Sequence, residues 1–467
     1  MSNIKEEVFK GEIEEYLGTK NIFERKIDEV FKRLRIKTGL NRAGIVKKDG
    51  YHAGHLLFIL VLLPILKIKT VQGFCRKHLE QWSEARKDAF YRLKTKDYRW
   101  RSLLYWITEI ALDVISTEDA CIVVDDTILK KTGGSIENVS YVYDHNAGKS
   151  VLGYCMVVIG LFTSGGFFPL DFGFSASDKR HKRGCEYKGD KRSSSGRMST
   201  EATEMTKLQL VESMIKRALS HGVKAKYVLF DSWFSFPSFI GKIRKLELHI
   251  VCRLKDMKTK YGYNGNDYRL SELYKQIRHS FKKDRETGLF LYPVTVEVSG
   301  VGLATIVFAR GYQEPDGQKE KWIAFLSTDL LLSPAEIIKK YTNRWSIEVF
   351  FKESKQLLAL GKEQSTSFNA QIASISISIM TYSILAFLNH SEKMPTKGEL
   401  FEYLSDKAAE ITYGQRLWTF FYGLFKKSLN SIFNIIGSNA DCSHYMNIID
   451  SSLQAYTGYT PLLRCET

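Results

Sequence analysis

Two short apolar runs in this chain each end in an aspartate, and they favour a fold built around a buried sheet. The first run is Cys121–Val124, which is followed by Asp125 and Asp126. The second is Tyr227–Phe230, which is followed by Asp231. Apolar runs of this length next to turn-forming residues predict buried strands. A single aspartate at a strand end is usually a turn former, but α/β sheets also place their sites there.

The surrounding pattern predicts the element order strand, strand, strand, helix, strand, with a further strand after these. In chain order, the expected elements are the Asp125 strand, strands over 151–162 and 166–174, a helix over 203–220, the Asp231 strand and a strand over 248–254. A Ser164-Gly165-Gly166 turn between the second and third strands indicates a hairpin.

A third candidate acid, Glu348, lies in a predicted helix. Tyr341, Arg344, Glu348 and Lys355 are spaced so that, at about 100° per residue, they share one stripe of that helix. Apolar residues that can pack against a core flank the stripe: Ile347, Phe350, Phe351 and Leu358. A carboxylate between two cations and a phenol suits a metal ion and a phosphodiester. The alternative is a solvated helix face, which charged residues commonly form.

Taken together, the three acids have the chemistry of a magnesium site. Asp125, Asp231 and Glu348 offer hard carboxylate oxygens, which are the ligands that Mg²⁺ prefers. A pair of such ions can clamp the attacking and leaving oxygens of a phosphoryl displacement. The ordered set of three is therefore much stronger evidence than any one acid alone.

These residues give the chain a resemblance to the DDE transposases of bacterial insertion sequences, in the IS-four-like group. That group carries a Tyr-x2-Arg-x3-Glu-x6-Lys signature, an Asp-x-Thr first motif and a second strand-end aspartate. The matching residues here are Tyr341, Arg344, Glu348 and Lys355, then Asp125 to Thr127, then Asp231. The resemblance covers roughly residues 118–390 and implies a ribonuclease H-like core. Relatives stack a tryptophan of an inserted β-region on a flipped base. Trp322 is expected in a strand, so that role is left unassigned.

The expected fold is α/β, with a ribonuclease H-like mixed-sheet core, an inserted antiparallel β-region, and helical regions at both ends. More than a hundred residues separate Asp231 from Glu348, which is too many for a loop in a compact domain. We expect a helical DNA-binding domain over 1–117, the first part of the core over 118–254, the insertion over 255–335, the second part of the core over 336–390, and a helical region over 391–467 that serves a dimer interface or a local core.

The net charge of +16 over 467 residues points to a polyanionic partner, most commonly nucleic acid. Two basic segments are candidate DNA contacts. One is the loop with Lys179, Arg180, Lys182 and Arg183, and the other is the second helix of a possible helix-turn-helix, with Arg86, Lys87 and Arg92. A solvated loop and an ordinary helical hairpin are the alternatives.

The cysteines and the apolar segments favour an intracellular protein that does not enter a membrane. Seven cysteines without a Cys-x-x-Cys pair argue against structural zinc or a disulfide framework. The apolar stretch over 55–66 is too short to span and contains Pro64. The stretch over 370–389 is long enough but rich in serine, which favours a buried helix. We expect a cytoplasmic, nucleoid-associated bacterial protein.

The leading hypothesis is a transposase that cuts the ends of a mobile element and joins them to target DNA. Asp125, Asp231 and Glu348 are expected to hold two Mg²⁺ ions, for which Mn²⁺ can substitute, and Tyr341, Arg344 and Lys355 to bind phosphates of double-stranded DNA. A homodimer is expected in the synaptic complex. The alternatives are a DNA-binding regulator derived from a transposase without catalytic activity, and a nuclease without strand transfer.

Strand geometry distinguishes Asp125 from its neighbour Asp126. Successive strand residues point to opposite faces, so only one of the two carboxylates can face the metals unless a bulge intervenes. The spacing to Thr127 matches the family motif when Asp125 is the ligand, with Asp126 as the alternative. Asp125→Ala is expected to eliminate metal-dependent DNA cleavage, whereas Asp126→Ala should leave measurable activity. The opposite result would move the ligand to Asp126.

Overall fold

The computed structural model describes residues 29–47, 49–77, 85–176, 186–311, 322–392 and 397–405. The chain divides into two compact units, which are considered separately. The terminal unit comprises Met1–Asn41, Ile45–Lys94 and Ser391–Thr467. The sheet unit comprises Arg42–Gly44 and Thr95–His390.

The described part of the terminal unit is helical. Its first helices are α2 (Ile36–Arg42, whose last residue belongs to the sheet unit), α3 (Ala53–Ile65), α4 (Val71–Lys77) and α6 (Lys87–Thr95, whose last residue also belongs there). Helix α3 is apolar and mostly buried, and Pro64 lies near its end. An edge-to-face contact between Phe74 and Phe90, with ring centroids 6.1 Å apart, packs α4 against α6. The turn expected between these two helices lies outside the described residues.

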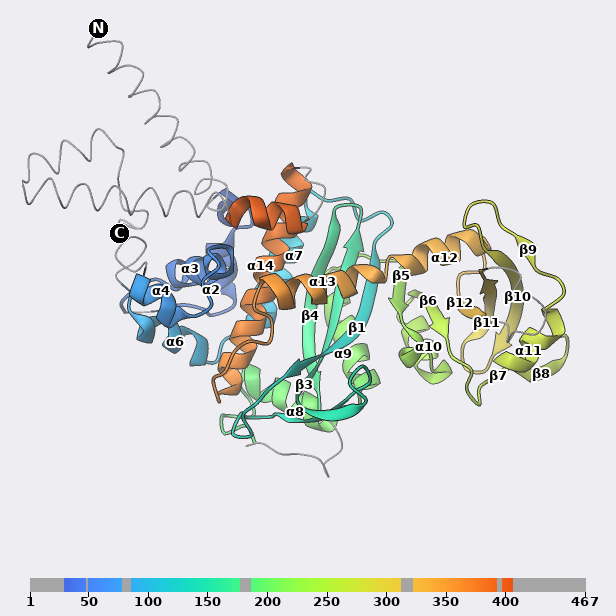
Figure 1. Ribbon diagram of the computed structural model, residues 1–467, viewed down its shortest axis with the longest axis horizontal. Helices are drawn as coiled ribbons and strands as arrows, with labels where there is room; N and C mark the ends of the chain where they lie inside the picture. The colour runs from blue at the N-terminus through green and yellow to red at the C-terminus, as the bar shows by residue number, and fades with distance from the viewer. Residues whose placement is uncertain are drawn as a thin grey trace, which may run out of the picture. The chain divides into compact units, whose positions relative to one another are not determined.

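A 12-stranded mixed sheet forms the centre of the described sheet unit (Figure 1). Its strands are β1 (Cys121–Lys130), β2 (Ser140–Asp144), β3 (Lys149–Thr163), β4 (Gly166–Ser175), β5 (Tyr227–Phe230), β6 (His249–Leu254), β7 (Lys260–Tyr263), β8 (Asn266–Arg269), β9 (Lys282–Lys283), β10 (Phe290–Val298), β11 (Gly302–Arg310) and β12 (Ile323–Ser327).

The strand order explains how the two aspartate runs come together. Strands β1, β5 and β6 are parallel neighbours, and β3 pairs antiparallel with the other edge of β1. The full path is β2-β3-β1-β5-β6-β12-β11-β10-β7-β8, with β4 paired to β3 and β9 to β10. The strands expected in the insertion therefore continue the same sheet through β12. This large mixed sheet with its helices confirms the predicted α/β class and is consistent with a ribonuclease H-like transposase fold.

Helices cover both faces of the strands around β1 (Figure 1). The helices of the sheet unit are α7 (Trp100–Leu112), α8 (Ser194–Glu204), α9 (Lys207–Ser220), the 3₁₀ turn η2 (Ser232–Phe234), α10 (Pro237–Arg244), α11 (Leu270–Ile277), α12 (Pro334–Thr342), α13 (Trp345–Leu357) and α14 (Phe368–Glu392).

Successive side chains of β1 point to opposite faces of the sheet, so their contacts show which face each helix covers. Ile122 and Val124 belong to a buried cluster that also contains Leu210 and Met214 of α9. On the other face the ring of Phe167 lies over Gly160, and it contacts Phe350 of α13 at 5.7 Å between centroids. A side chain on residue 160 would collide with that ring, which explains the glycine. Helices α9 and α13 therefore lie on opposite faces of the sheet.

Two helices differ from the sequence expectation. The helix expected over 203–220 is divided, because Thr206 caps the start of α9 in a reciprocal capping box with Gln209. The helix expected to carry the whole stripe from Tyr341 to Lys355 is also divided, since α12 ends at Thr342 and α13 begins at Trp345. Asn343 and Arg344 keep right-handed helical dihedrals, so the change in direction is small.

Helix α14 corresponds to the long apolar stretch. Within the described residues it is the one helix long and apolar enough to cross a membrane, and 94% of its apolar window is buried inside the protein. Tyr382 packs edge-to-face on Phe350, with ring centroids 4.8 Å apart. Helix α14 is therefore buried in the manner of a core helix.

A buried ionic network ties β4 to the helices on the α9 face. Asp171 has no exposed side-chain surface and pairs with Arg101 of α7 at 3.0 Å and Arg217 of α9 at 2.7 Å. Both arginines also pair with Glu201 of α8, at 2.7 and 3.4 Å. The phenol of Tyr105 donates to Asp171 Oδ2 at 3.1 Å, and burial raises the pKa of Tyr105 well above its usual value.

Removal of the central charge should destabilise the sheet unit. Asp171→Asn keeps the size of the side chain but leaves two mostly buried guanidinium groups with one carboxylate, which typically costs about 3–5 kcal/mol. Urea unfolding of the full chain measures this loss. Asp190→Asn, which removes an exposed ion pair with Arg192 at 3.2 Å, is the control and should cost far less, because exposed ion pairs contribute little to stability. Equal effects of the two variants would contradict the assignment.

Candidate active site

Asp125 and Asp231 lie side by side on neighbouring parallel strands. The register pairs Val124 with Phe230, so the residue that follows each is an aspartate at the same level of the sheet. Asp125 was expected at the end of its strand but lies within β1, which runs on to Lys130. Strand β5 does end at Phe230, and Asp231 caps the turn η2, with its Oδ1 accepting from the backbone N–H of Trp233 at 2.9 Å. This parallel pairing brings the two acids to the same level of their strands.

Arg344 connects Asp125 to Glu348, the third candidate acid. Its Nη1 donates to Asp125 Oδ2 at 3.1 Å, and its Nη2 pairs with Glu348 Oε1 one helical turn further along. The arginine is 7% exposed, and its guanidinium also lies 5.6 Å from the ring centre of Tyr341. The core face of α13 is buried through Ile347 and Phe350, which fixes the rotation of the helix and directs Glu348 to this site.

Burial controls the electrostatics of the paired aspartates. Burial raises the pKa of Asp125 to about 7; the backbone N–H of Asp126 and the charge of Arg344 oppose the shift, and Asp231 adds to it. Burial also raises the pKa of Asp231. Burial by itself lowers the pKa of Arg344, but Tyr341, Glu348 and Asp125 outweigh that effect and raise it. The site therefore holds two closely spaced acids whose charged forms are unfavourable unless a cation lies beside them.

The other two residues of the helical stripe also lie around Asp125. Tyr341 is 8% exposed and packs against Phe325 of β12, with ring centroids 4.8 Å apart. Lys355 Nζ donates to Thr127 Oγ1 at 2.5 Å, which joins the end of α13 to β1. Burial, with the nearby Lys130, lowers the pKa of Lys355. All four stripe residues therefore face the side of the sheet that carries Asp125.

The three acids are chemically suited to bind a divalent cation. In this structure, however, Arg344 provides the positive charge beside them. Carboxylates of Asp125, Asp231 and Glu348 are hard oxygen ligands suited to Mg²⁺ or Mn²⁺. Among the described residues, no group of three or more His, Cys, Asp or Glu side chains is close enough to hold a metal ion. A guanidinium that bridges two of the three acids marks a place where cationic charge is favourable.

Asp126 points to the opposite face of β1. Its Oδ1 accepts from Lys207 Nζ, at the start of α9, at 3.0 Å, and its Oδ2 accepts from Cys155 Sγ at 3.2 Å. The strand is regular here, with Asp125 opposite Val158 and Asp126 opposite Val157 of β3, so no bulge reverses the alternation. Asp125 is the member of the pair beside Arg344 and Glu348.

The remaining predicted DNA contacts lie elsewhere. Arg86, Lys87 and Arg92 are exposed at and beside α6 in the terminal unit. Lys179, Arg180, Lys182 and Arg183 lie outside the described residues. Trp322, whose role was left unassigned, precedes β12 and stacks on Tyr274 at 4.8 Å between centroids. That contact places it against the core of the inserted strands.

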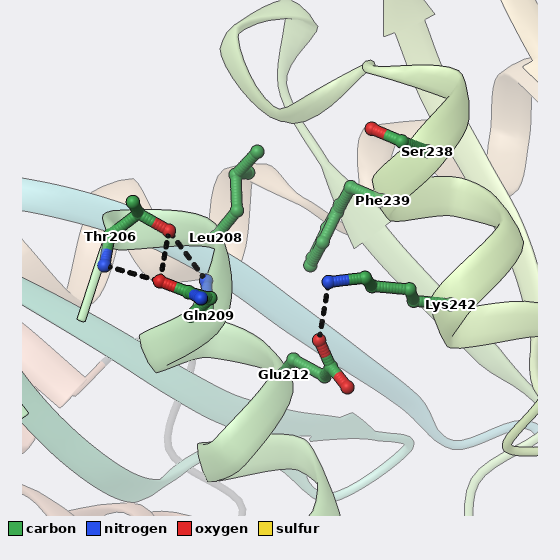
Figure 2. A pocket seen from close by; sticks show the side chains of 7 residues that line it. All are labelled: Thr206, Leu208, Gln209, Glu212, Ser238, Phe239 and Lys242. Carbon is green, nitrogen blue, oxygen red and sulfur yellow. Dashed lines mark hydrogen bonds and ion pairs between the residues drawn. The ribbon is translucent and has the colours of Figure 1, made fainter.

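A pocket of about 200 Å³ lies between the starts of α9 and α10, and none of the three acids lines it (Figure 2). Its apolar wall comes from Leu208 and Phe239, and Glu212 pairs across it with Lys242 at 3.4 Å. Glu212 also binds Lys216 at 2.7 Å, so its carboxylate is neutralised. The two charged residues that line the pocket are therefore paired with each other.

Two side chains beside the acids were not singled out from the sequence. Lys207 approaches Asp126 from α9, and Trp233 follows Asp231 in η2 and is 43% exposed. In the sequence, Trp233 could have been noticed because it lies two residues after Asp231. Lys207 gives a weaker indication: a cation at the first position of a helix opposes the helix dipole, which suggests that it has another role.

Comparison with known protein families gives two matches whose ranges include the candidate acids. A model described as "DDE superfamily endonuclease" matches residues 51–263, and one described as "Transposase DDE domain" matches residues 199–384. The first range contains Asp125 and Asp231, and the second contains Asp231 and Glu348. No curated protein matches the chain. The two family matches support a DDE transposase, with an enzyme activity of the nuclease type.

Proposed function

We propose that this protein cleaves the ends of an insertion sequence and transfers the resulting 3′-hydroxyl ends to target DNA. The observation that supports the proposal is that Asp125 and Asp231 lie at the same level of neighbouring strands, and that Arg344 pairs with both Asp125 and Glu348. The stripe of Tyr341, Arg344, Glu348 and Lys355 favours the IS-four-like group of DDE transposases.

In this proposal Asp125, Asp231 and Glu348 would hold two Mg²⁺ ions, or Mn²⁺ in their place. When bound, such ions activate the attacking oxygen and stabilise the leaving oxygen of a phosphoryl transfer. The side chains of the protein orient the DNA and neutralise its charge. Arg344 exchanges its carboxylate partners for a backbone phosphate, to which its guanidinium can donate two parallel hydrogen bonds. Lys355, beside Thr127, binds a neighbouring phosphate.

The proposed partners follow from this chemistry. The net charge of +16 suits double-stranded DNA, both the terminal inverted repeats and the target. Cutting two ends together requires two active sites, so we propose a homodimer in the synaptic complex and a cytoplasmic, nucleoid-associated location. The basic residues Arg86, Lys87 and Arg92 are proposed to add DNA contacts from the terminal unit.

One assay separates the proposal from its alternatives. Purified protein is incubated with Mg²⁺, labelled element ends and a target plasmid, and the products are resolved on a gel. Cutting followed by joining supports the transposase. Cutting alone indicates a nuclease without strand transfer, and binding without cutting indicates a regulator.

Glu348→Gln tests the metal-binding role of the helix acid. Glutamine keeps the size and hydrogen bonding but removes the negative charge, so folding and DNA binding should persist. Cleavage should fall by more than about 100-fold, the upper end of what outer-shell changes around a metal usually cost. Cleavage rates, circular dichroism and gel shifts are the measurements. Wild-type cleavage by this variant would remove Glu348 from the proposed triad.

Lys355→Ala tests the proposed phosphate contact. Loss of one such contact should weaken binding to element ends and flatten the log–log dependence of affinity on salt by roughly one unit. Lys216→Ala is the matched control, because it also removes one positive charge but lies on α9, on the opposite face of the sheet. Titrations at several salt concentrations supply the slopes. Identical slopes for wild type and Lys355→Ala would show that this residue does not bind phosphate.

A further inference from the structure

Lys207 occupies a position that is unfavourable for its own helix. It is the first residue of α9, next to the N-cap Thr206, where the helix dipole disfavours a positive charge. Its side chain is 16% exposed, so little of the charge is solvated. Helix formation therefore does not account for this lysine, and its partners do.

The amine of Lys207 is held between Asp126 and Trp233. It pairs with Asp126 Oδ1 at 3.0 Å and lies 4.0 Å from the centre of the Trp233 ring, within the range of a cation–π contact. The second oxygen of Asp126 accepts from Cys155 at 3.2 Å, which fixes the plane of the carboxylate. The ring of Trp233 also makes an edge-to-face contact with Phe234, with centroids 4.9 Å apart.

Trp233 is directly connected to the second candidate metal ligand. Its backbone N–H donates to Asp231 Oδ1 at 2.9 Å, so the position of residue 233 sets the orientation of the Asp231 carboxylate. The turn that contains it, η2, is only three residues long, and its neighbour Phe234 is buried in the core. Trp233 is 43% exposed, and Lys207 is the cation that covers its face.

We propose that Asp126, Lys207 and Trp233 form a brace that positions Asp231 for metal binding. This inference rests on the proposed function for its consequence, but its contacts are independent of any metal. Asp125 and Asp126 then have separate tasks on opposite faces of β1: the first is a ligand, and the second orients the neighbouring ligand through Lys207 and Trp233. All three members of the brace are assigned as positioning residues, because they act on Asp231 through the backbone N–H of Trp233.

The contact between Lys207 and Trp233 is tested first, without metal. Lys207→Met keeps most of the chain length but removes the charge, and it should increase acrylamide quenching of Trp233 fluorescence. Subtracting the signal of Trp233→Phe isolates this residue among the seven tryptophans. Lys207→Arg should restore wild-type quenching, since a guanidinium can pair with Asp126 and stack on the ring. Lys216→Met on the same helix is the control. Unchanged quenching in Lys207→Met overturns the brace.

The consequence for the site is tested by Mn²⁺ binding to the full-length protein, measured by electron paramagnetic resonance. Lys207→Met should raise the Kd for Mn²⁺ about tenfold, as outer-shell changes commonly do, and Lys207→Arg should restore it. Trp233→Leu should weaken binding similarly. The double variant should be no weaker than either single one, because both act through one contact. Wild-type affinity in both single variants overturns the positioning role.

Asp231→Asn distinguishes failure of the brace from failure of the proposed function. If this variant binds Mn²⁺ as tightly as wild type, Asp231 is not a ligand and the metal-binding function proposed above fails. The role of the brace in metal binding is then overturned with it, while the quenching result still decides whether the contact exists. If Asp231→Asn loses binding but Lys207→Met does not, only the positioning role is overturned.

Discussion

The parallel pairing of β1 with β5 is the contact on which the site depends. β1 is paired on both edges, by β3 and β5, and Ile122, Val123 and Val124 have no exposed surface. With that register, Asp125 and Asp231 must lie next to each other, where β5 ends and the fully buried part of β1 ends. Two carboxylates in such a place repel each other and are poorly solvated, and Arg344 supplies the opposing charge. The same repulsion makes the site suitable for divalent cations.

The route of the chain explains how Glu348 reaches the two aspartates. After Asp231 the chain adds β6 and then the strands from β7 to β12, with β12 returning to pair with β6. Helix α12 starts directly after this point and packs on β6 and β12. Tyr341 against Phe325 fixes its end, and α13 continues over β1. The inserted strands are therefore continuous with the sheet that carries the aspartates, and α12 connects them to the third acid.

Each face of β1 has its own cation. Arg344 pairs with Asp125 on the α13 face, and Lys207 pairs with Asp126 on the α9 face. Each cation also lies near an aromatic ring, Tyr341 on one side and Trp233 on the other. Charges buried to this extent are stable only with such partners, because desolvation of an isolated ion is very costly. Removal of either cation would therefore leave a largely buried carboxylate without its partner.

The sequence by itself determined the elements that depend on local pattern. Apolar runs predicted β1, β5 and β6, strand alternation separated Asp125 from Asp126, and helical spacing placed Arg344 and Glu348 on one stripe. These features follow from the period of a strand or helix, which neighbouring residues set. The break between α12 and α13 at Asn343 was not visible in that spacing, because its dihedrals remain helical.

Only the tertiary structure decided which distant side chains meet. Lys207 is 81 residues from Asp126, and Arg217 is 46 residues from Asp171, so no local period relates either pair. The pairing of Arg344 with Asp125, 219 residues away, has the same origin. Such contacts depend on the strand order and on which face of the sheet each helix covers. Those arrangements arise from burial of whole apolar faces, to which residues throughout the chain contribute.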